Sequence, residues 1–594
     1  MPATILWVLA SCTSGSVATD PPPPTARVVV PASADRTSYT LSFPDASRQR
    51  LHVKAVAADG CGEWWLPVWT PGSYVLREYA RHVTELSAHG PAGELPVTKV
   101  AKNRWAVDCG GASGPVALTY ELFADELSVR TNHVDADGAL LNGAPTFLVP
   151  AGAEASPASV SVLSPWPGVY TALTPAEDGT WVAANHDELV DSPWLLGDGM
   201  ERRFEVAGTP HRLVTLGGRD VFDHDQAAAD VQRIVETLHA QWGGFPYDDY
   251  LVLNGALGTR GGLEHDRSTL LLTDPWVTRD AEAYQGWLSV VAHEVFHAWN
   301  VKAMRPAMLG PFDYEHEVYT RELWIAEGFT SYYDDLTLLR AGLIDEEAWL
   351  AAMSKNLRRV VEHPGHLVQP LSDASFDAWI EYYRKDADTT NQAVSYYLKG
   401  AVVAWLLDTE IRRRSAGARS LDDVLRVGWE RFAATGYTDP RFRALASDVT
   451  GDDLGPWFVR HVDQAEPIDL QPALAWWGLT EKDAGEPKPW MGIERSGTRV
   501  TAVKRGGPGW GAGLNPDDVL VAVDGWVVDD GHDRLLGRAV GDEVVVTVAR
   551  SGRLRELTVV LGAEPQPPVL AVDPDAAPVT AQRRARFATV PERL

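Results

Sequence analysis

The chain has 594 residues, of which 45% are hydrophobic and 23% charged, and its formal net charge is −28. Single cores stop growing at roughly 250–300 residues, so this length predicts three or four domains. The acidic balance argues against nucleic acid or an anionic membrane surface as the main partner, and no apolar run approaches the ~18 residues needed to cross a bilayer.

The N-terminus contains a short hydrophobic stretch, "ATILWVLA" at residues 3–10, followed by Cys12. The piece "LASC" resembles a bacterial lipobox, in which the cysteine carries a lipid, but no Lys or Arg precedes it. The alternative is a frayed terminus before a Pro-rich linker. Residues 13–35 are typical of a disordered tether. A lipid anchor at Cys12 would be the only membrane attachment and would place the protein in the bacterial periplasm or cell envelope; the cytoplasm is the alternative.

Residues 36–205 alternate apolar and polar positions in short runs such as "SYTLSF" and "LHVKAVAA", separated by Gly, Pro and Asp. This period of two predicts an N-terminal antiparallel β domain. The region contains the remaining cysteines, Cys61 and Cys109. They are expected to form a disulfide if the compartment is oxidising, and two free buried thiols are the alternative.

Residues 206–481 change to helical periods, with one strand-like stretch, "YLVLNGAL", and predict an α+β domain rich in helices. A linker at 482–489 leads into a C-terminal β domain at 488–563. The Pro/Ala-rich segment 564–594 is expected to be a solvated tail, and its "RRARF" could instead be a docking patch. The fold class is therefore multidomain α+β.

The stretch "HEVFH" carries the clearest chemistry. On a helix His293 and His297 share one face, so both imidazoles can bind one metal ion. Glu294 lies on the adjoining face, where it can take a proton from the water that Zn²⁺ activates. Two satisfied core histidines are the alternative. A catalytic zinc needs a third ligand, and Glu327 is a carboxylate in the otherwise apolar "LWIAEGF".

"HEVFHAWNVKAMRP" followed by "LWIAEGFTSYY" closely resembles the PDZ-containing glycyl aminopeptidase family of zinc metallopeptidases, within the wider group that shares the aminopeptidase N and thermolysin-like catalytic fold. The resemblance implies one Zn²⁺ held by His293, His297 and Glu327, with Glu294 as general base. It also extends to "LPVWTPGSYVLREYARHV" in the N-terminal domain. Matching pieces span roughly residues 36–563.

Two further motifs resemble those of the wider group. In "GGLEH", 261–265, Glu264 would bind the α-amine of the substrate, and the backbone at Gly261 and Gly262 would hold the peptide. In "SYYLKG", 395–400, Tyr397 would hydrogen-bond the developing oxyanion. Tyr396 is the neighbour with which it could be confused.

The C-terminal pieces "WMGIE" and "GPGWGAGLNPDDVLVAVDG" resemble a PDZ domain, in which Met491, Gly492 and Ile493 would present backbone amides to a peptide carboxylate. The expected activity is removal of N-terminal Gly or Ala from peptides with a free amine. The alternatives are a zinc endopeptidase and a PDZ-bearing peptide-binding lipoprotein with a structural zinc. Structural zinc sites usually have four protein ligands, and the sequence offers three.

Overall fold

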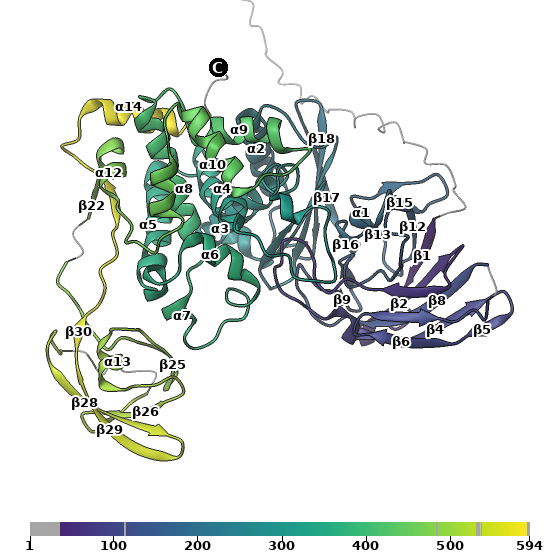
Figure 1. The fold of residues 1–594 in the computed structure, drawn as a ribbon, viewed down its shortest axis with the longest axis horizontal. Coiled ribbons are helices and arrows are strands. Elements are labelled where there is room, and N and C mark those ends of the chain that lie inside the picture. The colour runs from purple at the N-terminus through teal and green to yellow at the C-terminus, as the bar shows by residue number, and fades with distance from the viewer. Residues whose placement is uncertain (1–35, 112–113, 483–484, 530–534, 536, 591–594) are drawn as a thin grey trace, which may run out of the picture.

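The structure, a computed structural model, describes residues 36–111, 114–482, 485–529, 535 and 537–590. Figure 1 shows a β-rich N-terminal domain, a central domain rich in helices and a small C-terminal β domain, as the predicted fold class requires. Cys12 and its proposed lipid anchor lie outside the described residues. Within the described ranges, no helix combines the length and the hydrophobicity that crossing a membrane requires.

The N-terminal domain is built on an eight-stranded sheet of order β14-β15-β12-β1-β2-β8-β4-β5. Its alternating sequence becomes alternating burial, because β8 (Val116–Phe123) buries every second residue. One pairing differs from the all-antiparallel expectation: β1 (Thr37–Ser42) runs parallel to β12 (Ala158–Leu163). The other strands of the sheet are β2 (Arg50–Ala57), β4 (Val83–Gly90), β5 (Gly93–Leu95), β14 (Thr174–Pro175) and β15 (Trp181–Ala183).

Two four-stranded sheets complete this domain, in the orders β11-β3-β7-β6 and β13-β16-β10-β9. Their strands, and the helix α1 (His186–Val190) beside them, are β3 (Gly62–Trp65), β6 (Val97–Ala101), β7 (Arg104–Val107), β9 (His133–Val134), β10 (Gly138–Leu141), β11 (Val149–Pro150), β13 (Gly168–Thr171) and β16 (Trp194–Gly197).

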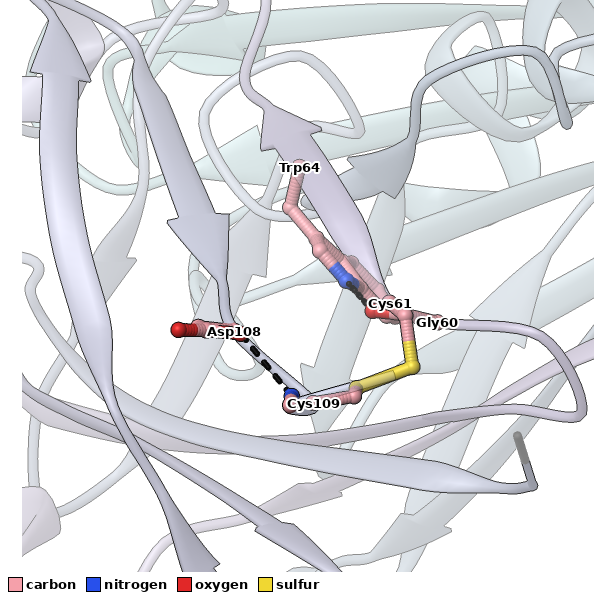
Figure 2. Close-up of a disulfide and its surroundings, with 6 residues drawn as sticks. Gly60, Cys61, Trp64, Asp108 and Cys109 are labelled. Atoms are coloured by element: carbon pink, nitrogen blue, oxygen red, sulfur yellow. Dashed lines mark hydrogen bonds between the residues drawn. A yellow bond between two sulfur atoms is a disulfide. The ribbon is translucent and has the colours of Figure 1, made fainter. Parts of the chain in front are cut away.

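A disulfide joins Cys61, just before β3, to Cys109, just after β7 (Figure 2). The two strands are paired directly, so their ends bring the cysteines together, with 5.9 Å between the Cα atoms. Next to the bridge, Trp64 Nε1 donates to the carbonyl oxygen of Gly60 at 2.8 Å. Of the two alternatives for these cysteines, the structure has the disulfide.

The central domain contains a five-stranded sheet of order β17-β18-β19-β21-β20. Strands β18 (Thr209–Leu216), β19 (Tyr250–Ala256) and β21 (Ser268–Thr273) are parallel, and the edge strands β17 (Met200–Val206) and β20 (Gly261–Glu264) are antiparallel to their neighbours. This sheet therefore begins at Met200, within the stretch expected to close the N-terminal domain.

Helices cover this sheet and extend beyond it. They are α2 (His224–Trp242), α3 (Ala281–Phe296), α4 (Phe329–Arg340), α5 (Glu346–Val361), α6 (Leu371–Phe376), α7 (Thr389–Gln392), α8 (Leu398–Arg414), α9 (Leu421–Phe432), α10 (Asp439–Thr450), α11 (Gly455–His461) and α12 (Gln471–Trp477). The core of the domain also takes in Val68, Trp69 and Tyr74 from the N-terminal domain. A loop of one domain is thus part of the interior of the other.

The C-terminal β domain is inserted between two strands, β22 (Leu479–Glu481) and β31 (Leu570–Val572), that pair with each other. Its main sheet follows the order β24-β25-β26-β28-β29, with β27 paired to β26. The elements are β23 (Pro489–Trp490), β24 (Ile493–Ser496), β25 (Arg499–Val503), α13 (Pro508–Ala512), β26 (Val519–Val523), β27 (Trp526–Val527), β28 (Glu543–Arg550), β29 (Arg553–Val560) and β30 (Gly562–Ala563).

The expected solvated tail is instead largely folded, since the chain returns to the central domain as β31 and the helix α14 (Pro578–Phe587) (Figure 1). Phe587 is buried and packs on the rings of Trp349 and Trp477. Arg584 pairs with Glu346 at 2.7 Å. The stretch "RRARF" therefore docks on its own chain. Burial of the Phe587 side chain favours this docking, although the charged residues of the stretch suggested a solvated tail.

Candidate metal centre and active site

Helix α3 places two histidines at its C-terminal end. The helix starts after Asp280, whose side chain caps the backbone N–H of Ala283 at 2.8 Å, and it ends at Phe296. His293 lies in the last turn and His297 is the C-terminal cap. Their ring centroids are 4.7 Å apart, so the two imidazoles share one face as the four-residue spacing predicts.

Glu327 approaches these imidazoles from a π-helical turn, η5 (Trp324–Gly328), that leads into α4. Its Oε2 lies 3.6 Å from His293 Nε2 and 3.2 Å from His297 Nε2. Ligand atoms at ~2.0–2.1 Å from one tetrahedral zinc ion are about 3.3 Å apart, so the donor set fits that metal. The carboxylate is buried, which opposes its charge, but the two imidazoles outweigh burial and hold the pKa of Glu327 at about 2.

Both imidazoles are oriented by their other ring nitrogen. His297 Nδ1 lies 2.7 Å from the carbonyl oxygen of Asn300, and His293 Nδ1 lies 3.4 Å from Asp334 Oδ2. With Nδ1 as the donor in each case, Nε2 is left with a lone pair directed at the shared site. Such outer partners are typical of metal-binding histidines.

A second group of potential ligands shares one histidine with the first. The ligand atoms of Glu264, Glu294 and His297 all lie within 4.8 Å of one another. Two oriented imidazoles and one carboxylate are the donor set of known catalytic zinc sites, so the group of His293, His297 and Glu327 is the one that fits a zinc ion. Glu264 and Glu294 lie beside this group and are not needed to complete it.

Glu294 turns its carboxylate toward strand β20. Its Oε2 is buried and has no hydrogen-bond partner among the described residues. Burial raises the pKa of Glu294 to about 7, although the neighbouring His293 and His297 oppose the shift. A carboxyl group that titrates near neutrality beside a metal site is suited to general-base catalysis.

Gly262 lets the carboxylate of Glu294 rest on the backbone of β20, because a Cβ at this position would lie 2.1 Å from Glu294 Oε1. At Gly261 an added Cβ would meet nothing nearer than the methyl groups of Val129, at 3.4 Å. Both glycines pair with β21 in regular strand geometry, so alanine can adopt either backbone.

We expect Gly262→Ala to reduce kcat by about 100-fold, since a displacement of about 1 Å in a catalytic group costs this much. Gly261→Ala, whose added methyl does not meet Glu294, is the matched control and should lose far less turnover than Gly262→Ala. Steady-state kinetics of both variants at equal zinc content tests the contact. Equal loss in the two variants would show that the strand, rather than the position of Glu294, is disturbed.

Glu264 ends strand β20 and is only 5% exposed. A loop of the N-terminal domain covers it, because a Cβ on Gly72 would lie 2.6 Å from both of its carboxylate oxygens. Gly72 has a φ of +81°, which also favours glycine. Beside Glu264 residues of both domains line a small pocket of about 10 Å³, which is roughly the space of one water molecule.

Tyr397 precedes helix α8 and stacks on His293, with ring centroids 6.3 Å apart. Its hydroxyl lies 3.3 Å from that of Tyr383. Tyr396 instead packs its ring on Tyr382 and Tyr397. Of the two neighbouring tyrosines in "SYYLKG", Tyr397 is therefore the one beside the metal site.

In the C-terminal β domain, Met491 and Gly492 directly precede the edge strand β24, which begins at Ile493. The carbonyl oxygens of Met491 and Gly492 accept from the N–H groups of Gly509 and Lys504, at 2.7 and 2.9 Å. An edge strand can pair with an added peptide strand. Residues 530–534 and 536 of this domain lie outside the described residues.

Four further residues of the site were not predicted from the sequence: Gly72, Arg130, Asp334 and Tyr383. Asp334 follows Glu327 by seven residues, two helical turns on the same face, and this spacing was a usable signal. Gly72 and Arg130 come from the N-terminal domain, and no local pattern connects them with a motif about 130 residues or more away. Tyr383 precedes the predicted Tyr397 by 14 residues on a separate turn.

Comparison with known families supports this arrangement. The M61 glycyl aminopeptidase model matches residues 286–403, the Peptidase M61 N-terminal domain matches 38–198, and a PDZ domain matches 499–550. These matches confirm the resemblance found in the sequence motifs. The first includes both histidines, Glu294, Glu327 and Tyr397. A comparison with curated proteins finds no match.

Among solved structures, an aminopeptidase N family protein from Idiomarina loihiensis superposes with a TM-score of 0.86 at 29% identity, covering 92% of this chain and 99% of that one. An M1 zinc metallopeptidase from Deinococcus radiodurans superposes with a TM-score of 0.44 at 15% identity, covering 73% and 95%. The first likeness extends through all three domains described above.

Proposed function

We propose that this chain, a peptidase with the N-terminal and catalytic domains of the M61 glycyl aminopeptidase family, is a zinc-dependent aminopeptidase that releases Gly or Ala from the N-termini of peptides. The observation that carries the proposal is the convergence of three metal-binding atoms with two further buried carboxylates, Glu294 and Glu264. One carboxylate serves proton transfer and the other serves recognition of the free amine.

The metal would be held by His293, His297 and Glu327. When bound, zinc supplies Lewis acidity, which polarises the peptide carbonyl and lowers the pKa of a water. Glu294, with its unpartnered oxygen and its raised pKa, takes a proton from the attacking water and delivers it to the leaving amine.

Glu264 selects the end of the peptide. Its buried carboxylate pairs with the ammonium group of the first residue, which places the first peptide bond next to Glu294. A peptide that continues past this point would put a neutral amide against the carboxylate and clash with the loop at Gly72. The preference for Gly or Ala as the first residue follows from the resemblance to the glycyl aminopeptidase family.

Tyr397 is placed to stabilise the negative charge that develops on the carbonyl oxygen. Burial raises its pKa well above the usual value, and Glu327 adds to the shift. The phenol therefore remains protonated and can donate a hydrogen bond. Tyr383, whose hydroxyl lies 3.3 Å away, orients it.

The test compares Gly-, Ala- and Leu-initiated peptides with their N-acetylated twins, using the zinc-loaded protein and Glu264→Gln. The wild type should release Gly and Ala from free peptides and leave the acetylated twins intact. Glu264→Gln should lose roughly 10- to 100-fold in kcat/KM on free peptides, the effect of removing a hydrogen bond to a charged group. Internal cleavage of acetylated peptides by the wild type would identify an endopeptidase instead.

We further propose that the protein works in an oxidising compartment, such as the periplasm or cell envelope, because the disulfide between Cys61 and Cys109 persists only outside a reducing cytoplasm. Protein isolated without reductant and then denatured should leave both cysteines unreactive toward a thiol label. Labelling of both would contradict the proposal.

A peptide partner at the PDZ domain is a separate proposal. It is supported by the position of β24 at the edge of its sheet, as far as the described residues show, and by the loop of Met491, Gly492 and Ile493. This domain is anchored to the catalytic domain, since Asn391 donates to the carbonyl oxygen of Val503 and accepts from the N–H of Arg505, each at 2.8 Å. Isothermal titration with peptides that have a free or an amidated C-terminus tests it, and equal binding of both would exclude carboxylate recognition.

A further inference from the structure

Arg130 is an arginine of the N-terminal domain that reaches the edge strand of the active site. It lies between β8 and β9, and its Nη2 donates to the carbonyl oxygen of Gly262 at 3.4 Å. The backbone on either side is fixed, because the N–H of Arg130 donates to Ser128 Oγ at 3.1 Å and its carbonyl oxygen accepts from the hydroxyl of Tyr79 at 2.9 Å. The guanidinium is therefore held beside β20 by its own loop.

The hydrogen-bonding capacity of Arg130 is largely unused. A guanidinium has five N–H donors, yet its Nε is buried without a partner among the described residues. No carboxylate of those residues forms an ion pair with it, and its contact with Gly262 is long. Arg130 as a whole is partly exposed, and leaving its buried Nε–H unpaired is costly, so the geometry points to an anionic partner that is not part of the protein.

The surroundings keep Arg130 charged. Burial opposes its charge, but Tyr383, Tyr397, Glu294 and Glu264 together outweigh burial and raise the pKa of the guanidinium. Both of these carboxylates already have a function in the proposed reaction. Arg77, another arginine of the N-terminal domain, already has a partner within the protein. Its Nε and Nη2 donate to Ser73 Oγ at 3.1 and 2.8 Å.

Arg130 lies beside β20 at the level of Gly262, and this position determines how long a substrate must be to reach it. Gly262 precedes Glu264 by two residues, or about 6.6 Å at the rise of a strand. An extended dipeptide separates its α-amine from its α-carboxylate by about the same two-residue span. With the ammonium on Glu264 and the peptide antiparallel to β20, the carboxylate of a dipeptide arrives level with Gly262, where Arg130 lies.

We propose that Arg130 binds the C-terminal carboxylate of the substrate, so that the enzyme selects dipeptides with a small first residue. The inference rests on the aminopeptidase function proposed above, because Glu264 must hold the other end. A guanidinium binds a carboxylate through two parallel N–H···O bonds. In this proposal the N-terminal domain contributes the residue that makes the enzyme selective for dipeptides, and the catalytic domain contributes the residues that hydrolyse the peptide bond.

The test uses Gly-Leu, its C-terminal amide Gly-Leu-NH₂ and the longer peptide Gly-Leu-Gly-Gly with the full-length, zinc-loaded protein. The wild type should cleave Gly-Leu with a kcat/KM roughly 10- to 100-fold above that of the amide, as expected for a charge-assisted hydrogen bond. The longer peptide should resemble the amide. Wild-type cleavage of all three at equal rates would overturn the proposal without any variant.

Arg130→Gln should lower kcat/KM on Gly-Leu far more than on its amide, so that the difference between the two substrates disappears. Arg81→Gln, which removes an exposed positive charge from the same domain, should keep the wild-type preference. Equal losses on acid and amide in Arg130→Gln would show that Arg130 positions Tyr397 or Glu294 instead. If wild-type protein releases no glycine from any of the three, the aminopeptidase function itself fails.

Discussion

Glu294→Gln is expected to reduce kcat by roughly 100- to 10,000-fold, the usual contribution of a positioned general acid–base group. Glutamine keeps the size of the side chain and its place against Gly262, but it cannot accept the proton of the attacking water. Because Glu294 is outside the assigned ligand set, the variant should still bind one zinc per chain. Steady-state kinetics together with the zinc content of the purified variant provide the measurement.

The zinc content decides how a loss of activity is interpreted. An inactive Glu294→Gln protein that retains its metal supports the role in proton transfer. An inactive protein that has lost its metal would place Glu294 among the ligands, as part of the second group with Glu264 and His297. Wild-type turnover in a folded variant would remove Glu294 from the mechanism.

Glu327→Gln is expected to weaken zinc binding, in contrast to Glu294→Gln, and to lose activity because it loses the metal. The carboxylate faces both imidazoles at 3.2 and 3.6 Å, and a neutral amide is a poor replacement for an anionic ligand. The loss of affinity should exceed the roughly 10- to 100-fold that follows removal of an outer partner of a ligand. Titration of the metal-free protein against a zinc buffer measures it.

Asp334→Asn is the matched control for this experiment, since Asp334 contacts His293 at 3.4 Å and is outside the assigned ligands. Its loss of zinc affinity should fall within the range of an outer partner, about 10- to 100-fold, and excess zinc should restore its activity. If Glu327→Gln bound zinc as tightly as the wild type, the assignment of the third ligand would be wrong.

Local patterns in the sequence predicted much of this site. The four-residue spacing of His293 and His297 is a property of a single helix and needs no tertiary information. Glu327 stood out as a carboxylate within an apolar run, and burial of that run leaves metal binding as its natural role. The role of Gly261 and Gly262 came from the resemblance alone, and the structure places both in strand β20, paired with β21.

The remaining parts of the site depend on long-range packing. Gly72 and Arg130 reach the catalytic residues because the loops of one domain insert against the sheet and core of another. No sequence pattern around Gly72 or Arg130 predicts these contacts between domains. The tail was mispredicted for a similar reason, because the burial of Phe587 depends on a pocket formed by Trp349 and Trp477 far away in the sequence.

These contacts make the N-terminal domain part of the site. Gly72 covers Glu264, and Arg130 lies beside Gly262. A free catalytic domain would lack both the cover over the amine site and the guanidinium. The two domains therefore form one active site, and the amine and carboxylate ends of a short peptide would be read by different domains.

Stepwise addition of zinc to the metal-free protein, with free glycine and all other products of a Gly-initiated peptide measured at each step, tests the central claim most directly. The account predicts that glycine release rises with zinc and stops rising at one equivalent per chain, with glycine and the shortened peptide as the only products. Activity that is independent of zinc, or fragments from internal bonds, would contradict it.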